Sequence, residues 1–339
     1  MKAAESPVRM SAASEGVRPF SSRYLLALAI GALGVIVLFA CALVGLDSVG
    51  RLPPPQLANN LCVDEKLRYL QASSAFDAPS FQPAVLAVGS SVSWRTFDGE
   101  AVDRASGGRV QSFNGGFCGL KMNETAFTTR YFLDRYPSVR EVVTIIAPQD
   151  MTDCRNARAQ LFDPNDADDY IYGDAWVFPL YLKYFDPFTF IKNVVRMKRA
   201  FRWGVAFDRY GGLPIATEEH QTRLVYGKLD AYDPSCFAAL RGLANELRAE
   251  GRRLVVASMP MHPGWLDRYD PERQRMPQFE RRIDEALADT GATYWRPKHF
   301  ALERDDFVDA IHIRWSAAQD FSRALVEETR LGQASFKRD

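Results

Sequence analysis

This chain of 339 residues has no excess of charge of either sign, because Lys and Arg together number 42 and so do Asp and Glu. Proteins that bind nucleic acid through phosphate contacts carry a basic surface, and the sequence contains no nucleic-acid-binding motif. Histidine is scarce, at four residues, and no two cysteines form a C-x-x-C pair. Zinc sites are built from such residues. We therefore expect no nucleic-acid partner and no zinc.

Two further signatures are missing. The acidic residues between 163 and 169 lack the glycine and the terminal glutamate of a calcium-binding loop. The glycines of residues 115–119 have the wrong spacing for a dinucleotide-binding fingerprint, and no acidic residue follows them at the required distance. We therefore expect neither a metal nor an organic cofactor.

The N-terminal region has a strongly uneven charge distribution. Residues 24–46 carry no charge and, at about 1.5 Å per residue, would span roughly 35 Å, enough for a bilayer core of about 30 Å. Four basic residues precede them, against two acidic ones: Lys2, Arg9, Arg18 and Arg23, and Glu5 and Glu15. The positive-inside rule places residues 1–23 in the cytoplasm and the rest of the chain across the membrane. We expect a single-pass signal anchor in the inner (cytoplasmic) membrane and a periplasmic domain.

Two alternatives to an anchor remain. A cleaved signal peptide has an apolar region of about 7–15 residues, shorter than this one, and no convincing small-x-small site precedes Asp47. The string Leu38-Phe39-Ala40-Cys41 loosely resembles a bacterial lipoprotein box. The bulky Phe39 next to the small residue argues against lipidation at Cys41.

Four cysteines follow the apolar segment: Cys62, Cys118, Cys154 and Cys236. In an oxidising compartment they could form up to two disulfides, with three possible pairings. The alternative is that some are free, buried residues that behave as small apolar side chains. The sequence does not choose among the pairings.

Beyond the apolar segment, residues 47–80 read as a spacer and a leading helix, and residues 81–339 as one α/β domain. Residues 51–55 (RLPPP) are typical of a stiff extended linker, and residues 59–75 of a short helix. Predicted strands then alternate with predicted helices, which indicates a parallel sheet with helices on both faces. The predicted strands are residues 84–88, 109–113, 141–147, 253–259 and 293–295. The predicted helices are residues 123–136, with Asn123 as a possible cap, 235–250, 272–290 and 316–331.

The alternation fails between residues 152 and 233, which we interpret as an insertion. It begins acidic, becomes rich in aromatic residues, and is basic and amphipathic over residues 192–203. Such a segment could cap a site or face the membrane. The alternative is helical padding over an edge of the sheet.

Three groups of polar residues follow predicted strands, at residues 89–91, 147–150 and 259–262. The carboxyl ends of parallel strands share one edge of a sheet, where ligands bind, so we expect these groups to converge. Ser91 could be a nucleophile at a strand-to-helix turn, where the helix dipole favours developing negative charge. Alternatively, this serine-rich turn could simply cap the helix.

Asp309 and His312 lie three residues apart, before the last predicted helix. A serine hydroxyl is a poor nucleophile until an imidazole accepts its proton and a carboxylate holds that imidazole in the right tautomer. Together with Ser91, the pair supplies these three groups, and acyl transfer is the chemistry that they perform.

Other residues at the same edge are candidates for binding. Residues 115–119 are glycine-rich, so their backbone N–H groups could approach an oxyanion, or they could form a tight turn. Gln149 could donate to an oxyanion or bond its own backbone. His262 and Asp150 are weaker candidates for contact with substrate.

Taken in order, these blocks resemble the SGNH (GDSL-like) hydrolase superfamily. Its members carry a nucleophile block after the first strand, a glycine block after the second, Gly-x-Asn-Asp after the third, and Asp-x-x-His near the end. The resemblance covers residues 84–331 without the insertion. It implies a three-layer α/β/α domain with a parallel flavodoxin-like sheet. The matching residues here are 89–91, 115–119, 147–150 and 309–312.

By that resemblance Ser91 is the nucleophile, His312 the base and Asp309 the partner that orients it. The backbone N–H groups of Ser91 and Gly119 would join the Gln149 side chain in an oxyanion hole.

Two positions depart from the family pattern. Ser90 stands where the usual Asp of Gly-Asp-Ser lies, and Gln149, longer by one methylene, replaces the usual Asn. Gly-Ser-Ser with an N-terminal anchor is similar to the branch with the D-alanyl-transfer proteins of teichoic acid modification, and to alginate O-acetylation proteins.

This resemblance implies an O-acyltransferase or esterase that acts on a cell-envelope polysaccharide. Its ligand would be an acylated glycan or acyl donor, and its partner a multi-pass membrane acyltransferase. The alternative, motivated by the two departures, is a catalytically degenerate domain that binds glycan or scaffolds an envelope complex.

Overall fold

The computed structural model describes residues 22–173, 176–200, 206–215, 224, 229, 231–297, 300 and 302–333. The chain divides into two compact units between Leu52 and Pro53, and each is described by itself. The first contains helix α1 (Ser22–Ser48), which extends two residues beyond each end of the predicted apolar segment. Of the helices in the described ranges, α1 alone is long and apolar enough to cross a bilayer.

The second unit is built on a five-stranded sheet with the order β2-β1-β3-β4-β5. Every neighbouring pair of strands is parallel, and Leu86 of β1 stands opposite both Phe113 of β2 and Val142 of β3. This is the doubly wound, flavodoxin-like order, so the predicted α/β fold class is confirmed. The strands are β1 (Val85–Val88), β2 (Ser112–Asn114), β3 (Glu141–Ile146), β4 (Arg253–Ser258) and β5 (Thr293–Trp295).

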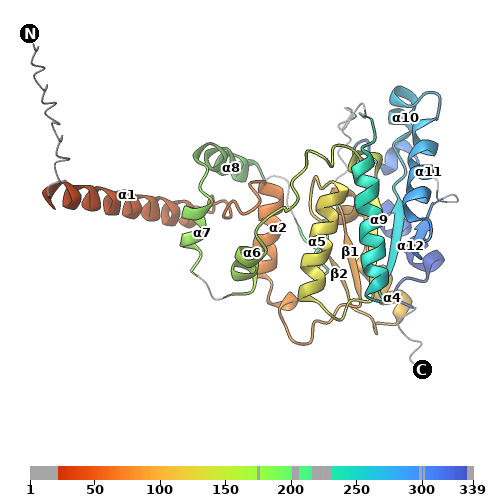
Figure 1. Ribbon diagram of the computed structural model, residues 1–339, viewed down its shortest axis with the longest axis horizontal. Coiled ribbons are helices and arrows are strands. Elements are labelled where there is room, and N and C mark those ends of the chain that lie inside the picture. The colour runs from red at the N-terminus through yellow and green to blue at the C-terminus, as the bar shows by residue number, and fades with distance from the viewer. Residues whose placement is uncertain are drawn as a thin grey trace, which may run out of the picture. The chain divides into compact units, whose positions relative to one another are not determined.

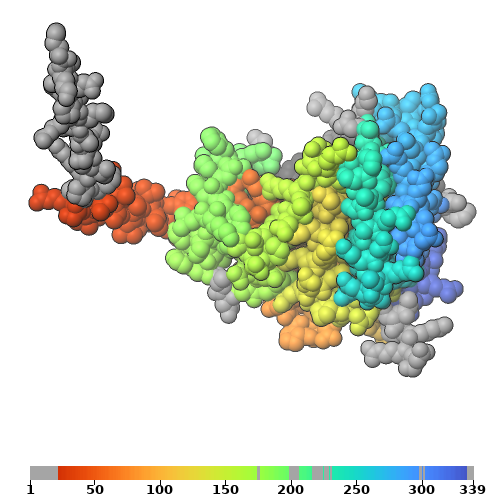
Figure 2. Space-filling view, viewed as in Figure 1, coloured from red at the N-terminus to blue at the C-terminus, as the bar shows by residue number. Residues whose placement is uncertain are grey.

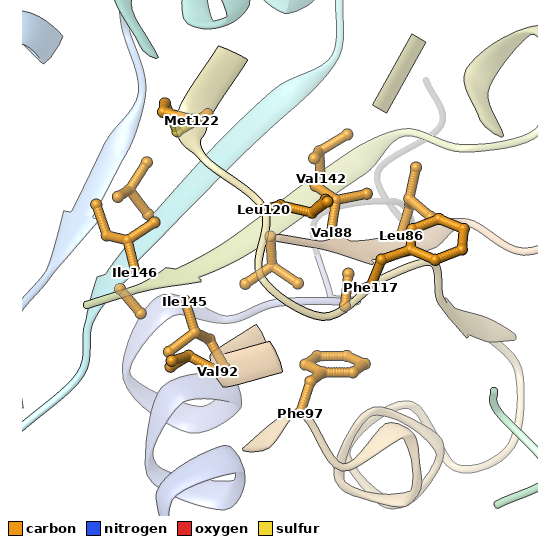
Figure 3. Packing of buried hydrophobic residues seen from close by; sticks show 14 of the residues in the cluster. Leu86, Val88, Val92, Phe97, Phe117, Leu120, Met122, Val142, Ile145 and Ile146 are labelled. Atoms are coloured by element: carbon orange, nitrogen blue, oxygen red, sulfur yellow. The ribbon is translucent and has the colours of Figure 1, made fainter. Parts of the chain in front are cut away.

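Helices cover both faces of the sheet, which gives three layers (Figure 1). One face carries α5 (Met122–Arg135), α9 (Pro234–Ala249) and α11 (Arg275–Leu287). The other carries α3 (Ser91–Thr96), α4 (Gly99–Ser106) and α12 (Trp315–Thr329). Because β1 and β3 are buried on both sides, neither alternates apolar with polar residues: β1 is entirely apolar, and β3 is apolar except for Glu141 and Thr144. Figure 3 shows Val142 and Ile146 on one face of β3, and Ile145 on the other, toward Val92.

The predicted elements differ from the observed ones mainly at their ends. The predicted cap at Asn123 is wrong, because α5 begins at Met122 with Lys121 as its N-cap. The Glu124 carboxylate accepts the Lys121 N–H at 2.8 Å, while Asn123 lies in the first turn and donates to the Arg158 carbonyl. The leading helix is shorter than predicted, and two helices were not predicted. The leading helix is α2 (Leu61–Ala72), followed by η1 (Ser74–Phe76), and the helices not predicted between strands are α4 and α10 (Pro263–Tyr269).

The insertion contains three helices in its described part: α6 (Pro164–Ile171), α7 (Phe178–Lys183) and α8 (Pro187–Ala200). Residues 206–215 then return to the edge of the sheet, where the Asn114 N–H donates to the Tyr210 carbonyl at 2.8 Å. Lys66 of α2 is fully buried there and donates to the carbonyls of Asn114 and Gly211. Residues 206–215 therefore cover the β2 edge without forming a helix, and whether the insertion caps a site or faces the membrane stays a prediction.

Two disulfides select one of the three possible pairings. Cys62 of α2 is bonded to Cys118, which lies in the glycine-rich segment after β2. Cys154 is bonded to Cys236, so the second disulfide closes the insertion near its base. Cys41 is a free, exposed cysteine of α1.

Candidate active site

Ser91 is the first residue of α3 and follows β1 through a two-residue turn. Gly89 has φ of 136°, and a Cβ there would lie 2.3 Å from the Ser93 hydroxyl oxygen, so glycine is required. Ser90 is the N-cap of α3, because its hydroxyl accepts the Val92 N–H at 3.2 Å. The capping interpretation of this turn therefore applies to Ser90, while the role of Ser91 as a nucleophile stays a prediction.

Asp309 and His312 lie in a tight loop between η3 (Arg304–Asp306) and α12. The loop is closed by a hydrogen bond from the Val308 N–H to the His312 carbonyl at 2.8 Å. Inside it, one carboxylate oxygen of Asp309 accepts the backbone N–H groups of Ile311 and His312, each at 2.9 Å. These bonds hold the carboxylate in one orientation.

The three side chains form a continuous chain of hydrogen bonds. His312 Nδ1 lies 2.7 Å from the second carboxylate oxygen of Asp309, and His312 Nε2 lies 2.8 Å from Ser91 Oγ. All three are buried, with exposed fractions of 1% for His312, 7% for Asp309 and 8% for Ser91. The structure thus brings together residues 221 positions apart in the sequence.

The environment favours a charged Asp309 beside a neutral His312. Burial by itself would raise the pKa of Asp309, but the hydrogen bond and charge of His312, with two backbone N–H groups, lower it overall. Burial, with a smaller contribution from the Arg95 charge, lowers the pKa of His312 although Asp309 opposes this. At neutral pH, Nδ1–H can therefore donate to Asp309 while the Nε2 lone pair faces the Ser91 hydroxyl.

The glycine-rich segment after β2 packs against the first turn of α3. The Asn114 side chain donates to the Trp94 carbonyl at 3.0 Å and accepts the Gly116 N–H at 3.1 Å. A Cβ on Gly116 would lie 2.9 Å from Trp94 Cα, so only glycine allows this approach. Gly119, at the exposed end of the segment, has φ of 74° and directly follows the disulfide-bonded Cys118.

Gln149 and Asp150 lie in η2 (Pro148–Met151), just beyond β3. Lys121 Nζ donates to the Gln149 carbonyl at 2.7 Å, which ties this turn to the end of the glycine-rich segment. The Asp150 carboxylate accepts the Ala147 N–H at 2.9 Å and hydrogen-bonds the Ser90 hydroxyl. Burial raises the pKa of Asp150 to about 6. Asp150 thus braces the turn between β1 and α3, and the predicted roles of Gln149 and Asp150 toward substrate stay predictions.

His262 is the half-buried N-cap of α10. The ring Nδ1 of His262 accepts the Gly264 N–H at 2.9 Å, and the backbone N–H of His262 donates to the Ala310 carbonyl at 3.1 Å. The ring packs on Phe307, with 5.3 Å between centroids. His262 therefore adjoins the loop of Asp309 and His312, and its contact with substrate stays a prediction.

Three residues of this region were not singled out from the sequence. Ser93 donates to the Ile145 carbonyl and accepts the Ile145 N–H, both at 2.8 Å, which locks α3 onto β3. Lys121 positions the Gln149 turn, and the charge of Arg95 acts on His312. Serine, lysine and arginine are common at protein surfaces, so no local signal distinguishes these from solvated residues.

A surface hollow of about 900 Å³ lies away from the triad. It is lined by residues that include Glu141 and Arg253, at the amino ends of β3 and β4, and therefore opens at the opposite end of the strands.

In the described ranges, no group of three or more His, Cys, Asp or Glu side chains is arranged to hold a metal ion.

Comparisons with known proteins add little. No family model matches the chain, and no curated protein matches it by sequence. Among solved structures, the chain is similar to the inhibitor-bound form of an aryl esterase from M. smegmatis, at 12% identity and a TM-score of 0.36. That match covers 73% of this chain and 98% of the esterase. A likeness at this level carries no argument about activity, so the functional inference rests on the site itself.

Proposed function

We propose that this protein is a serine-dependent acyl-transfer enzyme in which Ser91, His312 and Asp309 form the catalytic triad. The observation that carries the proposal is the unbroken chain of hydrogen bonds from the Asp309 carboxylate through His312 to Ser91 Oγ. The lowered pKa of His312 supports it, because a general base must be neutral to accept a proton.

In the first half-reaction, Ser91 Oγ attacks the acyl carbonyl carbon while its proton passes to His312 Nε2. The tetrahedral intermediate collapses with cleavage of the bond to the leaving oxygen, which takes that proton from His312. A sugar hydroxyl or water then attacks the acyl-enzyme, again giving its proton to His312, and the second tetrahedral intermediate collapses with cleavage of the acyl–Oγ bond as His312 returns that proton to Ser91 Oγ. Asp309 stays ionised throughout and stabilises the imidazolium.

The oxyanion would be held by the N–H groups of Ser91 and Gly119 and by the Gln149 side chain. Ser91 is at the first position of α3, where an N–H has no acceptor within the helix. Lys121 holds the Gln149 turn near the glycine-rich segment, and the disulfide from Cys62 restrains Cys118 beside Gly119. These contacts supply the rigidity that an oxyanion hole needs.

We further propose that the enzyme is an O-acyltransferase or esterase acting on a cell-envelope polysaccharide, anchored by α1 with its catalytic domain in the periplasm. The apolar α1, the basic tail before it and the two disulfides support this location. The resemblance to envelope acylation proteins supports the substrate class, and also an acyl donor delivered by a multi-pass membrane acyltransferase.

The test is labelling of the full-length protein in detergent with a fluorophosphonate probe, beside Ser91→Ala and His312→Ala. Ser80→Ala, an exposed serine of the same domain, is the matched control. We expect labelling of the native protein and of Ser80→Ala, and none of the other two. Labelling that persists in Ser91→Ala would exclude this nucleophile. A native protein that never labels would favour the alternative of a glycan-binding or scaffold domain.

A further inference from the structure

The exposed apolar side chains of the second unit are concentrated in one short segment. Beyond Val49, every large hydrophobic residue that the described ranges leave exposed lies between positions 176 and 195. Two of them are largely in solvent, Trp176 at 76% and Phe188 at 86%. We call this set the α7–α8 apolar surface: Trp176, Leu182, Phe185, Phe188, Ile191 and Val195. In Figure 2 the green residues of α7 and α8 form part of the domain surface.

Helix α8 has apolar side chains on two opposite faces. Phe190 and Met197 are buried and fasten the helix to the domain. Phe188, Ile191 and Val195 recur at intervals of three and four residues, so they share the outward face. A helix at a water-exposed surface normally carries polar residues there. The fold of the domain therefore does not account for the outward face.

The exposed charged residues along α8 next to this face, Lys192 and Arg196, are basic. Lys183 at the end of α7 is paired with Asp166, and the half-buried Asp186 carboxylate accepts N–H groups of the first turn of α8. An apolar stripe with an exposed tryptophan and flanking lysines and arginines is typical of helices that lie in the interface of a bilayer with anionic lipids.

The segment is also attached to the chain close to the membrane anchor. The Tyr181 hydroxyl of α7 donates to the Pro53 carbonyl at 2.7 Å, and the Asp186 N–H donates to the Gln56 side chain at 3.1 Å. Helix α1 ends at Ser48, five residues before Pro53. At about 3.3–3.6 Å per residue, those residues reach no farther than roughly 18 Å. This length is an upper limit on the distance between the end of α1 and Pro53, the residue that Tyr181 contacts.

We propose that the α7–α8 apolar surface binds the lipid surface of the bilayer that α1 crosses, with its aromatic residues at the boundary of headgroups and acyl chains. The insertion then holds the domain in a set orientation above the membrane, in addition to the single helix. This inference rests on α1 being a membrane anchor and is independent of the chemistry at Ser91.

The test uses the full chain in nanodiscs of phosphatidylcholine and phosphatidylglycerol. A nitroxide is attached to Ile191→Cys in a Cys41→Ser background, and Arg323→Cys, an exposed position on α12, is the matched control. Collision with oxygen and with a water-soluble nickel chelate is measured by power saturation. We expect the label at position 191 to favour oxygen and exclude the chelate, and the label at position 323 to do the opposite.

Equal access of the nickel chelate to both labels would overturn the proposal. Shielding from both reagents with dipolar broadening between labels would do the same, because a second copy would then cover the surface. Failure of the chain to enter nanodiscs would remove the anchor on which the proposal rests, while fluorophosphonate labelling of Ser91 would be unaffected.

A second measurement uses the native tryptophan. Brominated lipids should quench a larger fraction of the tryptophan emission in the native protein than in Trp176→Phe. Adding Ile191→Glu to both proteins should reduce the difference between their quenched fractions. Identical quenching of the native protein and Trp176→Phe would contradict the proposal.

Discussion

Replacing Asp309 by asparagine tests the arrangement of the triad most directly. An asparagine can keep one oxygen for the N–H groups of Ile311 and His312, so the loop should retain its shape. Its NH₂ group would face His312 Nδ1 in place of a carboxylate oxygen, 2.7 Å away in the native protein. The imidazole would then carry its proton on Nε2, next to Ser91, where it cannot accept the serine proton.

The expected loss is about 10³–10⁴-fold in the rate of Ser91 modification, or about 4–5.5 kcal/mol at 1.36 kcal/mol per factor of ten. The pH dependence gives a second signature. Native activity should fall only below about pH 6.5, the ordinary pKa of histidine, because burial lowers the pKa of His312. Asp309 raises that pKa, so its removal should move the acidic limb to still lower pH while the plateau drops.

The assay is the second-order rate constant for fluorophosphonate labelling of the full-length protein between pH 4 and pH 8. Asp320→Asn, an exposed carboxylate paired with Arg323, is the matched control and should leave both the rate and the limb unchanged. An Asp309→Asn variant that keeps the native rate and an unshifted acidic limb would show that the carboxylate has no part in selecting the tautomer of His312.

Three further predictions concern stability and are checked by chemical denaturation of the full-length protein. Replacing both Cys62 and Cys118 by serine should lower the free energy of unfolding by up to ~4 kcal/mol, because that disulfide closes a loop of 56 residues; an unchanged midpoint would contradict this. Ser93→Ala should cost about 1–3 kcal/mol, since it leaves the backbone N–H and carbonyl of Ile145 without their hydroxyl partner; a loss below the error of the measurement would count against the locking role. Burial lowers the pKa of Lys66 to about 7, whereas the pKa in the unfolded chain is near 10.4. At pH values between these two, folding therefore releases a proton. The unfolding free energy of the native protein relative to Lys66→Met should therefore rise by up to about 4 kcal/mol from pH 7 to pH 10, and a flat difference would show that Lys66 stays charged.

The strands β1, β3 and β4 were predictable because each is a short, mainly apolar run that is largely buried. The strand β3 was expected at residues 141–147 and is found at Glu141–Ile146. The edge strand β2 was expected at residues 109–113 and is found at Ser112–Asn114, so it starts three residues later and ends one residue later. Its polar ends are held by tertiary contacts, such as that from Asn114 to Trp94, which leave no pattern in the sequence.

Residues that support the site were less predictable than the triad residues themselves. The structure gives the Asp150 carboxylate a bracing role, through hydrogen bonds from Ala147 and Ser90, that its position after β3 does not indicate. Lys121 has no distinguishing signal in the sequence, although it connects the two segments proposed to form the oxyanion hole. Such roles depend on which loops meet in space, and any single position offers only a common polar residue.

The apolar helix, the alternation of strands and helices, and the polar residues just past the strands can all be predicted without coordinates. They follow from hydropathy and periodicity, which are local properties of a few neighbouring residues. The contact of Ser91 with His312, the pairing of Cys62 with Cys118, and the exposure of the outward face of α8 among the described residues emerge only in the folded chain. They depend on the packing of segments that are far apart in the sequence, and no local stretch carries that information.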